Sequence, residues 1–263
     1  MSTLFAGPWR GEFGWMVATW IPAIRYRSKK YDRTVMIIDE AFRPLVEDFA
    51  EVMHDGIKAK LPDRWLADGK RPKPTAAQLE EIVGSRLIRP DADICMSNKK
   101  LYRIYGIRSS QPCNFGLLIH ARKVRKSDKW DREWPLANYI KIANEFSLHT
   151  SCTAASIGHP DGAEHVPGTI DMRGIPIDEL CSLMRNSNCL LSPSSGPAHL
   201  ASMCGCPHVV MTDNEYKRAI GGTNRDRYTR LWNPFQTPCK VLDKHNWQPP
   251  VDVVWEAVCR FVR

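Results

Sequence analysis

The sequence of 263 residues predicts an α/β protein made of two domains with mainly parallel sheets. Short apolar runs alternate along the chain with segments whose apolar residues recur at helical spacing. A polar stretch near residue 110 divides this alternation into two halves, and 43% hydrophobic residues suffice for a core in each. We therefore expect two Rossmann-like domains facing one cleft, residues 1–110 and 111–250, with a C-terminal helix at 251–263.

The first half contains apolar runs separated by helical or polar segments. The runs that predict strands are Thr3–Ala6, Thr34–Asp39, Arg86–Ile88 and Asp93–Met96. Residues 15–24 and Phe42–Met53 have apolar positions at helical spacing. Residues 54–80 are polar and include Asp-Gly-Lys-Arg-Pro-Lys-Pro, which predicts a loop.

The second half shows the same alternation more clearly. Its predicted strands are 115–120, 151–158, Cys189–Ser192 and 208–211. Pro135 and Pro176 each open a predicted helix, because proline is tolerated in the first helical turn. The final segment, 251–263, is an amphipathic helix. Strands that alternate with helices in this way favour a parallel sheet.

Charge and composition limit the class of protein. Residues 1–110 hold 19 Lys and Arg against 14 Asp and Glu, and residues 111–135 hold 6 against 3, while the remainder is balanced. This bias favours a polyanionic partner or a phosphate-bearing ligand, or else a basic solvated surface. No apolar run approaches the roughly 20 residues of a membrane span. The nine cysteines form no C-x-x-C pair, and with no secretory signal the prediction is a cytoplasmic protein with reduced thiols.

Residues 192–211, S-P-S-S-G-P-A-H-L-A-S-M-C-G-C-P-H-V-V-M, predict a strand, a tight turn and a short helix. Ser194 or Ser195 is suited to the N-cap, Pro197 to the first turn, and Gly205 to the C-terminal end. The free N–H groups of such a helix, at the carboxyl edge of a parallel sheet, form an anion site. A plain, well-capped turn is the alternative.

A metal site is the competing interpretation of this stretch. His199, Cys204, Cys206 and His208 are close in sequence, but C-x-C with flanking histidines is not a standard zinc spacing. Asp91-Ala92-Asp93 resembles a metal-binding triplet and lacks the matching surroundings. We therefore expect neither a metal nor a resident cofactor.

Basic residues follow the predicted strand 115–120. Arg122, Lys123, Arg125, Lys126 and Lys129 would lie at its carboxyl end, where arginine makes forked contacts to a diphosphate and lysine acts as a point charge. A solvated loop is the alternative. This loop and the helix start at Gly196 fall on the same edge of one predicted sheet.

The first βα turn holds an acid between two glycines, Gly11-Glu12-Phe13-Gly14. A carboxylate held there is suited to take a proton from an acceptor hydroxyl. The alternative is a turn in which Glu12 is solvent-exposed or caps the following helix.

Two segments, K-W-D-R-E-W-P-L (129–136) and residues 171–211, resemble the C-terminal domain of GT-B glycosyltransferases of the bacterial heptosyltransferase type. The resemblance covers residues 115–212 and implies a nucleotide-sugar donor. Taken together, the resemblance and the basic loop after strand 115–120 imply the following residues for donor binding: Gly11, Arg122, Lys123, Lys126, Lys129, Ser194, Ser195, Gly196, Pro197, His199, Asp213 and Glu215. It points to Glu12 as the general base. The family's usual acid before G-P-x-H is replaced here by Ser194-Ser195.

The resulting hypothesis is a metal-independent, inverting glycosyltransferase that uses a nucleotide sugar as co-substrate. The basic first half favours a polyanionic acceptor: a phosphorylated glycan, or DNA with hydroxymethylated bases contacted by loops such as 70–73 and 25–33. The alternative is a non-catalytic module that binds nucleotide or nucleic acid on a degenerate GT-B scaffold.

Overall fold

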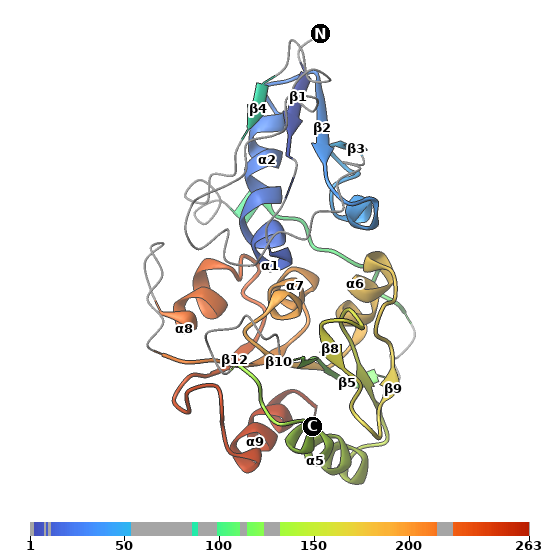
Figure 1. Ribbon diagram of the computed structural model, residues 1–263, viewed down its shortest axis with the longest axis vertical. Helices are drawn as coiled ribbons and strands as arrows, with labels where there is room; N and C mark the ends of the chain where they lie inside the picture. Colours follow the sequence, from blue (N-terminus) through green and yellow to red (C-terminus); the bar gives the residue numbers. More distant parts are fainter. Residues whose placement is uncertain are drawn as a thin grey trace. The chain divides into compact units, whose positions relative to one another are not determined.

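The computed structural model describes residues 3–7, 9, 12–53, 86–88, 99–110, 115–123, 132–214 and 223–262. The chain forms two compact units, Met1–Tyr102 and Arg103–Arg263 (Figure 1). Each unit is built on a parallel sheet with helices, so the predicted α/β class is confirmed. No helix among the described residues is long and apolar enough to cross a membrane.

The first unit has a four-stranded sheet in the order β3-β2-β1-β4, with every adjacent pair parallel. Its strands are β1 (Thr3–Ala6), β2 (Arg33–Ile37), β3 (Glu51–Met53) and β4 (Arg86–Ile88). Three of them confirm predicted strands. The central strand β1 carries Leu4 and Ala6, both fully buried, into the core of this unit.

One helical segment follows β1 and runs from α1 (Phe13–Trp15) through a π-helical turn, η1 (Met16–Trp20), into α2 (Ile21–Ser28). The π turn ends at Trp20, two residues before Pro22, which has no N–H to continue an α-helical ladder. The Ala18 carbonyl, four residues before Pro22, accepts a hydrogen bond from the Tyr102 hydroxyl at 2.8 Å. The predicted helix 15–24 is confirmed and extends to Ser28.

The helix predicted for Phe42–Met53 is wrong. The structure has a short 3₁₀ helix, η2 (Glu40–Leu45), in which the Asp39 carboxylate accepts from the Ala41 N–H at 2.9 Å, and then the strand β3. Pro44 lies inside the helical turn, and its missing N–H prevents a longer helix. Residues 51–53 instead pair with β2 as an edge strand. The predicted loop 54–80 and the predicted strand Asp93–Met96 lie outside the described residues.

The second unit has a six-stranded parallel sheet in the order β12-β11-β10-β5-β7-β9. The strands are β5 (Phe115–Ile119), β7 (Thr153–Ser156), β9 (Ile170–Asp171), β10 (Cys189–Pro193), β11 (His208–Met211) and β12 (Cys239–Leu242). All four predicted strands of this half are confirmed. The sequence did not predict β9 and β12, because β9 has two residues and Lys240 interrupts the apolar run of β12.

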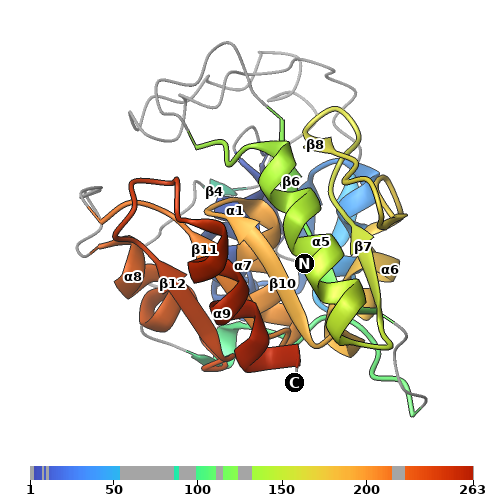
Figure 2. The ribbon, with the colours of Figure 1, turned by 90° about the horizontal axis from the view of Figure 1, so that it is seen from below.

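Helices cover both faces of this sheet (Figure 1). On one face α5 (Leu136–His149) and α9 (Val251–Val262) lie side by side, as Figure 2 shows, and cover Val209 and Met211 of β11. On the other face lie α6 (Ile177–Asn186) and α7 (Gly196–Cys204). Val210 packs there with Ala198 of α7 and Tyr228. The helices predicted to start near Pro135 and Pro176 are confirmed, with each proline at the N-cap.

Candidate functional site

The candidate site lies at the carboxyl edge of the second sheet, where β5, β10 and β11 end at neighbouring positions. His120 follows β5, Ser194 and Ser195 follow β10, and Asp213 lies two residues beyond β11. In open α/β sheets this edge is the usual place for a ligand. The residues after three adjacent strands thus define the site.

The turn after β10 leads directly into α7. Ser195 occupies the N-cap position with extended backbone, Pro197 lies in the first turn, and Gly205 ends the helix with a left-handed φ of 72°. This geometry confirms the predicted strand, turn and helix. The Ser195 side chain makes no capping hydrogen bond, so it does not occupy the N–H groups at the start of α7.

The Ser195 hydroxyl instead lies 3.2 Å from His120 Nδ1 and 3.1 Å from the Ser192 hydroxyl. His120 is buried, and burial, with the nearby Arg122 charge, lowers the pKa of its imidazole to about 3. The imidazole is therefore neutral at pH 7 and shares a hydrogen bond with the Ser195 hydroxyl, and it is too weak a base to remove the Ser195 proton. The pair therefore orients the N-cap and does not form a nucleophile–base dyad.

A second polar group holds the other serine of the turn. The Ser194 hydroxyl lies 2.8 Å from the Tyr228 hydroxyl, which lies 3.2 Å from Nε2 of His199. Tyr228 belongs to a π-helical turn, η5 (Arg227–Leu231), after the short helix α8 (Asn224–Asp226). Burial raises the pKa of the Tyr228 phenol, which is therefore protonated at neutral pH.

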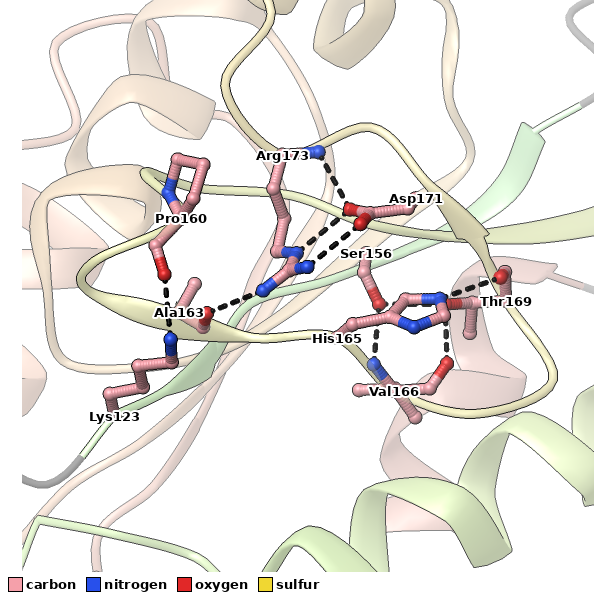
Figure 3. A network of polar contacts seen from close by, with 9 residues as sticks. All are labelled: Lys123, Ser156, Pro160, Ala163, His165, Val166, Thr169, Asp171 and Arg173. Atoms are coloured by element: carbon pink, nitrogen blue, oxygen red, sulfur yellow. Dashed lines mark hydrogen bonds and ion pairs between the residues drawn. The ribbon is translucent and has the colours of Figure 1, made fainter.

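The basic segment after β5 is fixed at its beginning. Strand β6 (Ala121–Arg122) pairs antiparallel with β8 (Ala163–Glu164), and Lys123 Nζ donates to the Pro160 carbonyl at 2.8 Å (Figure 3). Arg122 is half-buried beside His120. Lys126 and Lys129, which we predicted to contact the ligand, lie outside the described residues, as does Arg125.

An arginine holds the loop against which Lys123 rests. Arg173 binds the Asp171 carboxylate with Nε at 2.8 Å and Nη2 at 2.7 Å, and its Nη1 donates to the Ala163 carbonyl at 2.9 Å (Figure 3). Hydrogen bonds from Arg173 hold the pKa of Asp171 well below its usual range. Asp171 opens the segment 171–211 that carries the resemblance, and in this chain it anchors the loop beside the basic segment.

Asp213, predicted to reach a ribose or base, is buried and bonded within the chain. Its carboxylate accepts from Asn224 Nδ2 at 3.0 Å and from Trp247 Nε1 at 2.7 Å. Trp247 has a left-handed φ of 69°, an unusual conformation for a bulky residue. Glu215, the other residue predicted for this role, lies outside the described residues.

Arg132 is a site residue that the sequence reasoning missed. Its guanidinium carbon lies 5.2 Å from the centroid of the Trp247 ring, and its charge acts on the Tyr228 hydroxyl. The Arg132 Nε is buried without a hydrogen-bond partner among the described residues. The sequence contained one indication of Arg132: it lies in the segment K-W-D-R-E-W-P-L that carries the resemblance, two residues before Trp134-Pro135.

Glu12 belongs to the first unit, where it occupies the N-cap of α1 with extended backbone. Its carbonyl accepts from the Met16 N–H at 3.2 Å, and its half-buried side chain makes no capping hydrogen bond. Gly11 lies outside the described residues.

The residues of the competing metal interpretation are placed in the core. Cys204 and Cys206 are buried, and His208 contacts the Cys206 carbonyl at 2.9 Å and the Ser202 hydroxyl at 3.3 Å. Burial lowers the pKa of His208 to about 4. Within the part of the chain that the structure describes, no three His, Cys, Asp or Glu side chains gather as a metal site would need. The Asp91-Ala92-Asp93 triplet lies outside that part.

The structure is similar to solved glycosyltransferases. A glycosyl transferase of family 9 from Veillonella parvula DSM 2008 matches with a TM-score of 0.57 and 13% identity, covering 100% of this chain and 90% of the other. The Escherichia coli ADP-heptose lipopolysaccharide heptosyltransferase II matches with a TM-score of 0.56 and 12% identity, covering 100% and 98%. The E. coli heptosyltransferase WaaC with ADP matches with a TM-score of 0.51 and 10% identity, covering 99% of each chain.

The sequence matches no protein-family model and no curated protein. At 10–13% identity, the likeness to solved structures shows the fold, which is that of the GT-B glycosyltransferases. The resemblance stated for residues 115–212 is thereby confirmed at the level of the fold.

Proposed function

We propose that this protein is a glycosyltransferase that binds a nucleotide-sugar donor at the carboxyl edge of its second sheet. The observation that carries the proposal is the uncapped start of α7, held by His120 and Tyr228 and accompanied by the two half-buried arginines Arg122 and Arg132. Cations around a helix N-terminus suit a diphosphate. One solved protein with this fold was determined with ADP, which supports the same assignment.

The proposed chemistry needs no metal or resident cofactor. As the bond from the sugar to the diphosphate breaks, negative charge grows on the leaving oxygen. Arg122 and Arg132 supply fixed positive charge, and the α7 dipole adds to it at Ser195, Gly196 and Pro197. The predicted cations Lys126 and Lys129 belong to the same proposal.

Glu12 is the proposed general base. It would accept the proton of the acceptor hydroxyl while that oxygen attacks the anomeric carbon from the side opposite the diphosphate. Direct displacement of this kind inverts the anomeric configuration. The support is the place of Glu12 in the first βα turn of the chain, between β1 and α1.

For the acceptor we propose a polyanion, either a phosphorylated glycan or DNA with hydroxymethylated bases. The support is the charge of residues 1–110, with 19 Lys and Arg against 14 Asp and Glu. A gel-retardation assay with hydroxymethylated DNA in rising salt tests the second acceptor. Binding that weakens steeply as the salt concentration rises would support DNA as the acceptor. Absent or salt-insensitive binding would exclude it.

The decisive experiment for the donor is a thermal-shift screen with nucleoside diphosphates and nucleotide sugars. A ligand at 100 times its Kd stabilises the folded protein by about 2.7 kcal/mol and raises the melting temperature by several degrees. We expect one nucleoside to stand out and Arg132→Met to abolish its shift. A screen without any shift would contradict the donor assignment.

Turnover then separates an enzyme from a binding module. With the identified donor and a pool of acceptors, Glu12→Gln should retain the thermal shift and lose transfer, and the product should have the inverted anomeric configuration. Unchanged turnover in Glu12→Gln would show that Glu12 is not the base.

A non-catalytic module that binds nucleotide or nucleic acid is the second candidate. It is favoured by Ser194-Ser195, which stand where the resembling family carries an acid. Donor binding without consumption of any nucleotide sugar, in the presence of every acceptor tested, would support it.

A further inference from the structure

Tyr228 connects two residues at the start of α7 through its buried hydroxyl. The Tyr228 side chain is fully buried, and its hydroxyl contacts Ser194 Oγ at 2.8 Å and His199 Nε2 at 3.2 Å. Its ring lies parallel to the His199 ring, with centroids 4.8 Å apart and an interplanar angle of 4°. The Trp232 ring also contacts His199, edge-on with centroids 4.7 Å apart.

The two partners lie on either side of the first turn of α7. Ser194 immediately precedes the N-cap, and His199 is the fourth residue of the helix. The Ser194 N–H also donates to the Met211 carbonyl at 2.9 Å, which fixes its backbone to β11. Because the phenol is protonated at neutral pH and has one proton, it donates to one neighbour and accepts from the other. In either arrangement the phenol holds the Ser194 oxygen in place.

We propose that Tyr228 is a positioning residue for the donor site: its hydroxyl, braced by His199, fixes Ser194 and thereby the first turn of α7. The consequence for donor affinity rests on the proposed function. This role of Tyr228 also accounts for Ser194 in the Ser194-Ser195 pair. Ser194 is an uncharged group in the motif where the resembling family carries an acid, and a buried phenol holds it in place.

A second buried tyrosine shows that packing alone does not require a paired hydroxyl here. Tyr139 of α5 is equally buried in the same unit and packs edge-on against Trp134 at 4.9 Å. The Tyr139 hydroxyl is buried with no hydrogen-bond partner among the described residues. The paired hydroxyl of Tyr228 thus distinguishes it from a tyrosine that serves the core only, and Tyr139→Phe is a matched control.

The first test needs no ligand. In the unliganded protein we compare amide hydrogen exchange at Ser194 and His199, whose N–H groups donate to the Met211 and Ser195 carbonyls, in wild type, Tyr228→Phe and Tyr139→Phe. We expect Tyr228→Phe to speed exchange at these amides about tenfold, which corresponds to one lost hydrogen bond, without changing the amides of β5. Tyr139→Phe should leave them unchanged. Equal exchange in wild type and Tyr228→Phe would overturn the inference.

The second test measures ADP affinity by calorimetry, at a temperature where every variant is folded. Tyr228→Phe and Ser194→Ala should each weaken ADP binding about tenfold, and the double variant should bind no more weakly than either. Losses that simply add, or an unchanged Kd in Tyr228→Phe, would contradict a role through Ser194. If wild type binds no nucleoside diphosphate, the proposed function fails, and the exchange comparison alone decides the positioning role.

Discussion

Two buried neutral histidines predict that the protein loses stability as the pH falls from about 6.5 to about 4. Burial lowers the pKa of His120 to about 3 and that of His208 to about 4, from an ordinary value of 6.5. Below pH 6.5 the unfolded chain binds a proton at each histidine and the folded chain does not. The free energy of unfolding therefore falls with decreasing pH until the folded-state pKa values are reached.

The magnitude follows from the difference between the two states. Each histidine lowers the free energy of unfolding by about 1.4 kcal/mol for every pH unit below 6.5. At pH 5 the two histidines together therefore lower it by about 4 kcal/mol. For a chain of this size that corresponds to a melting temperature lower by about 10 °C. Carboxylates with lowered pKa, such as Asp226, add their own loss only below about pH 4, outside the interval between 6.5 and 5.

The assay is the melting temperature by circular dichroism from pH 7.5 to 4.5 at constant ionic strength. His208→Asn removes one of the two groups and should roughly halve the slope between pH 6.5 and 5. A melting temperature that stays constant over this interval would refute the assignment of both histidines as buried and neutral.

Three substitutions test other contacts by the same melting measurement. Gly158→Ala should destabilise by about 2 kcal/mol or more, because φ is +119° and the new Cβ would lie 2.7 Å from the His120 ring; an unchanged melting temperature would contradict this packing. Thr212→Val should be neutral or stabilising by up to about 1 kcal/mol, since its buried hydroxyl has no partner among the described residues, and a clear loss would reveal an unrecognised bond. Arg225→Met should cost about 1 kcal/mol, because it leaves the buried Asp243 carboxylate without its forked partner, while the exposure of Arg225 limits the loss; no loss would show that the pair is fully screened.

Local signals in the sequence predicted most of the second unit. The apolar strands β5, β10 and β11, the helix starts near Pro135 and Pro176, and the end of α7 at Gly205 each depend on residues within one element. The α/β class followed from their order. The segment Phe42–Met53 shows the limit, because its helical spacing was outweighed by Pro44 and by pairing of residues 51–53 with β2.

The partners of the site residues could not be predicted, because they come from distant parts of the chain. Ser195 contacts His120, which lies 75 positions away in the sequence, and Ser194 contacts Tyr228, which lies 34 positions away. Arg132 lies over Trp247, more than a hundred residues further along the chain. No local periodicity or spacing encodes such pairs.

The sequence by itself determined that this chain forms parallel sheets and that a serine-rich turn starts a helix at the carboxyl edge of one of them. Apolar alternation, proline and glycine act within a few residues, so they can be read locally. Only the tertiary structure decided what the two serines do. Their hydroxyls are directed by a neutral imidazole and a buried phenol, and these lie beside them only because the folded sheet and helix α7 bring them together.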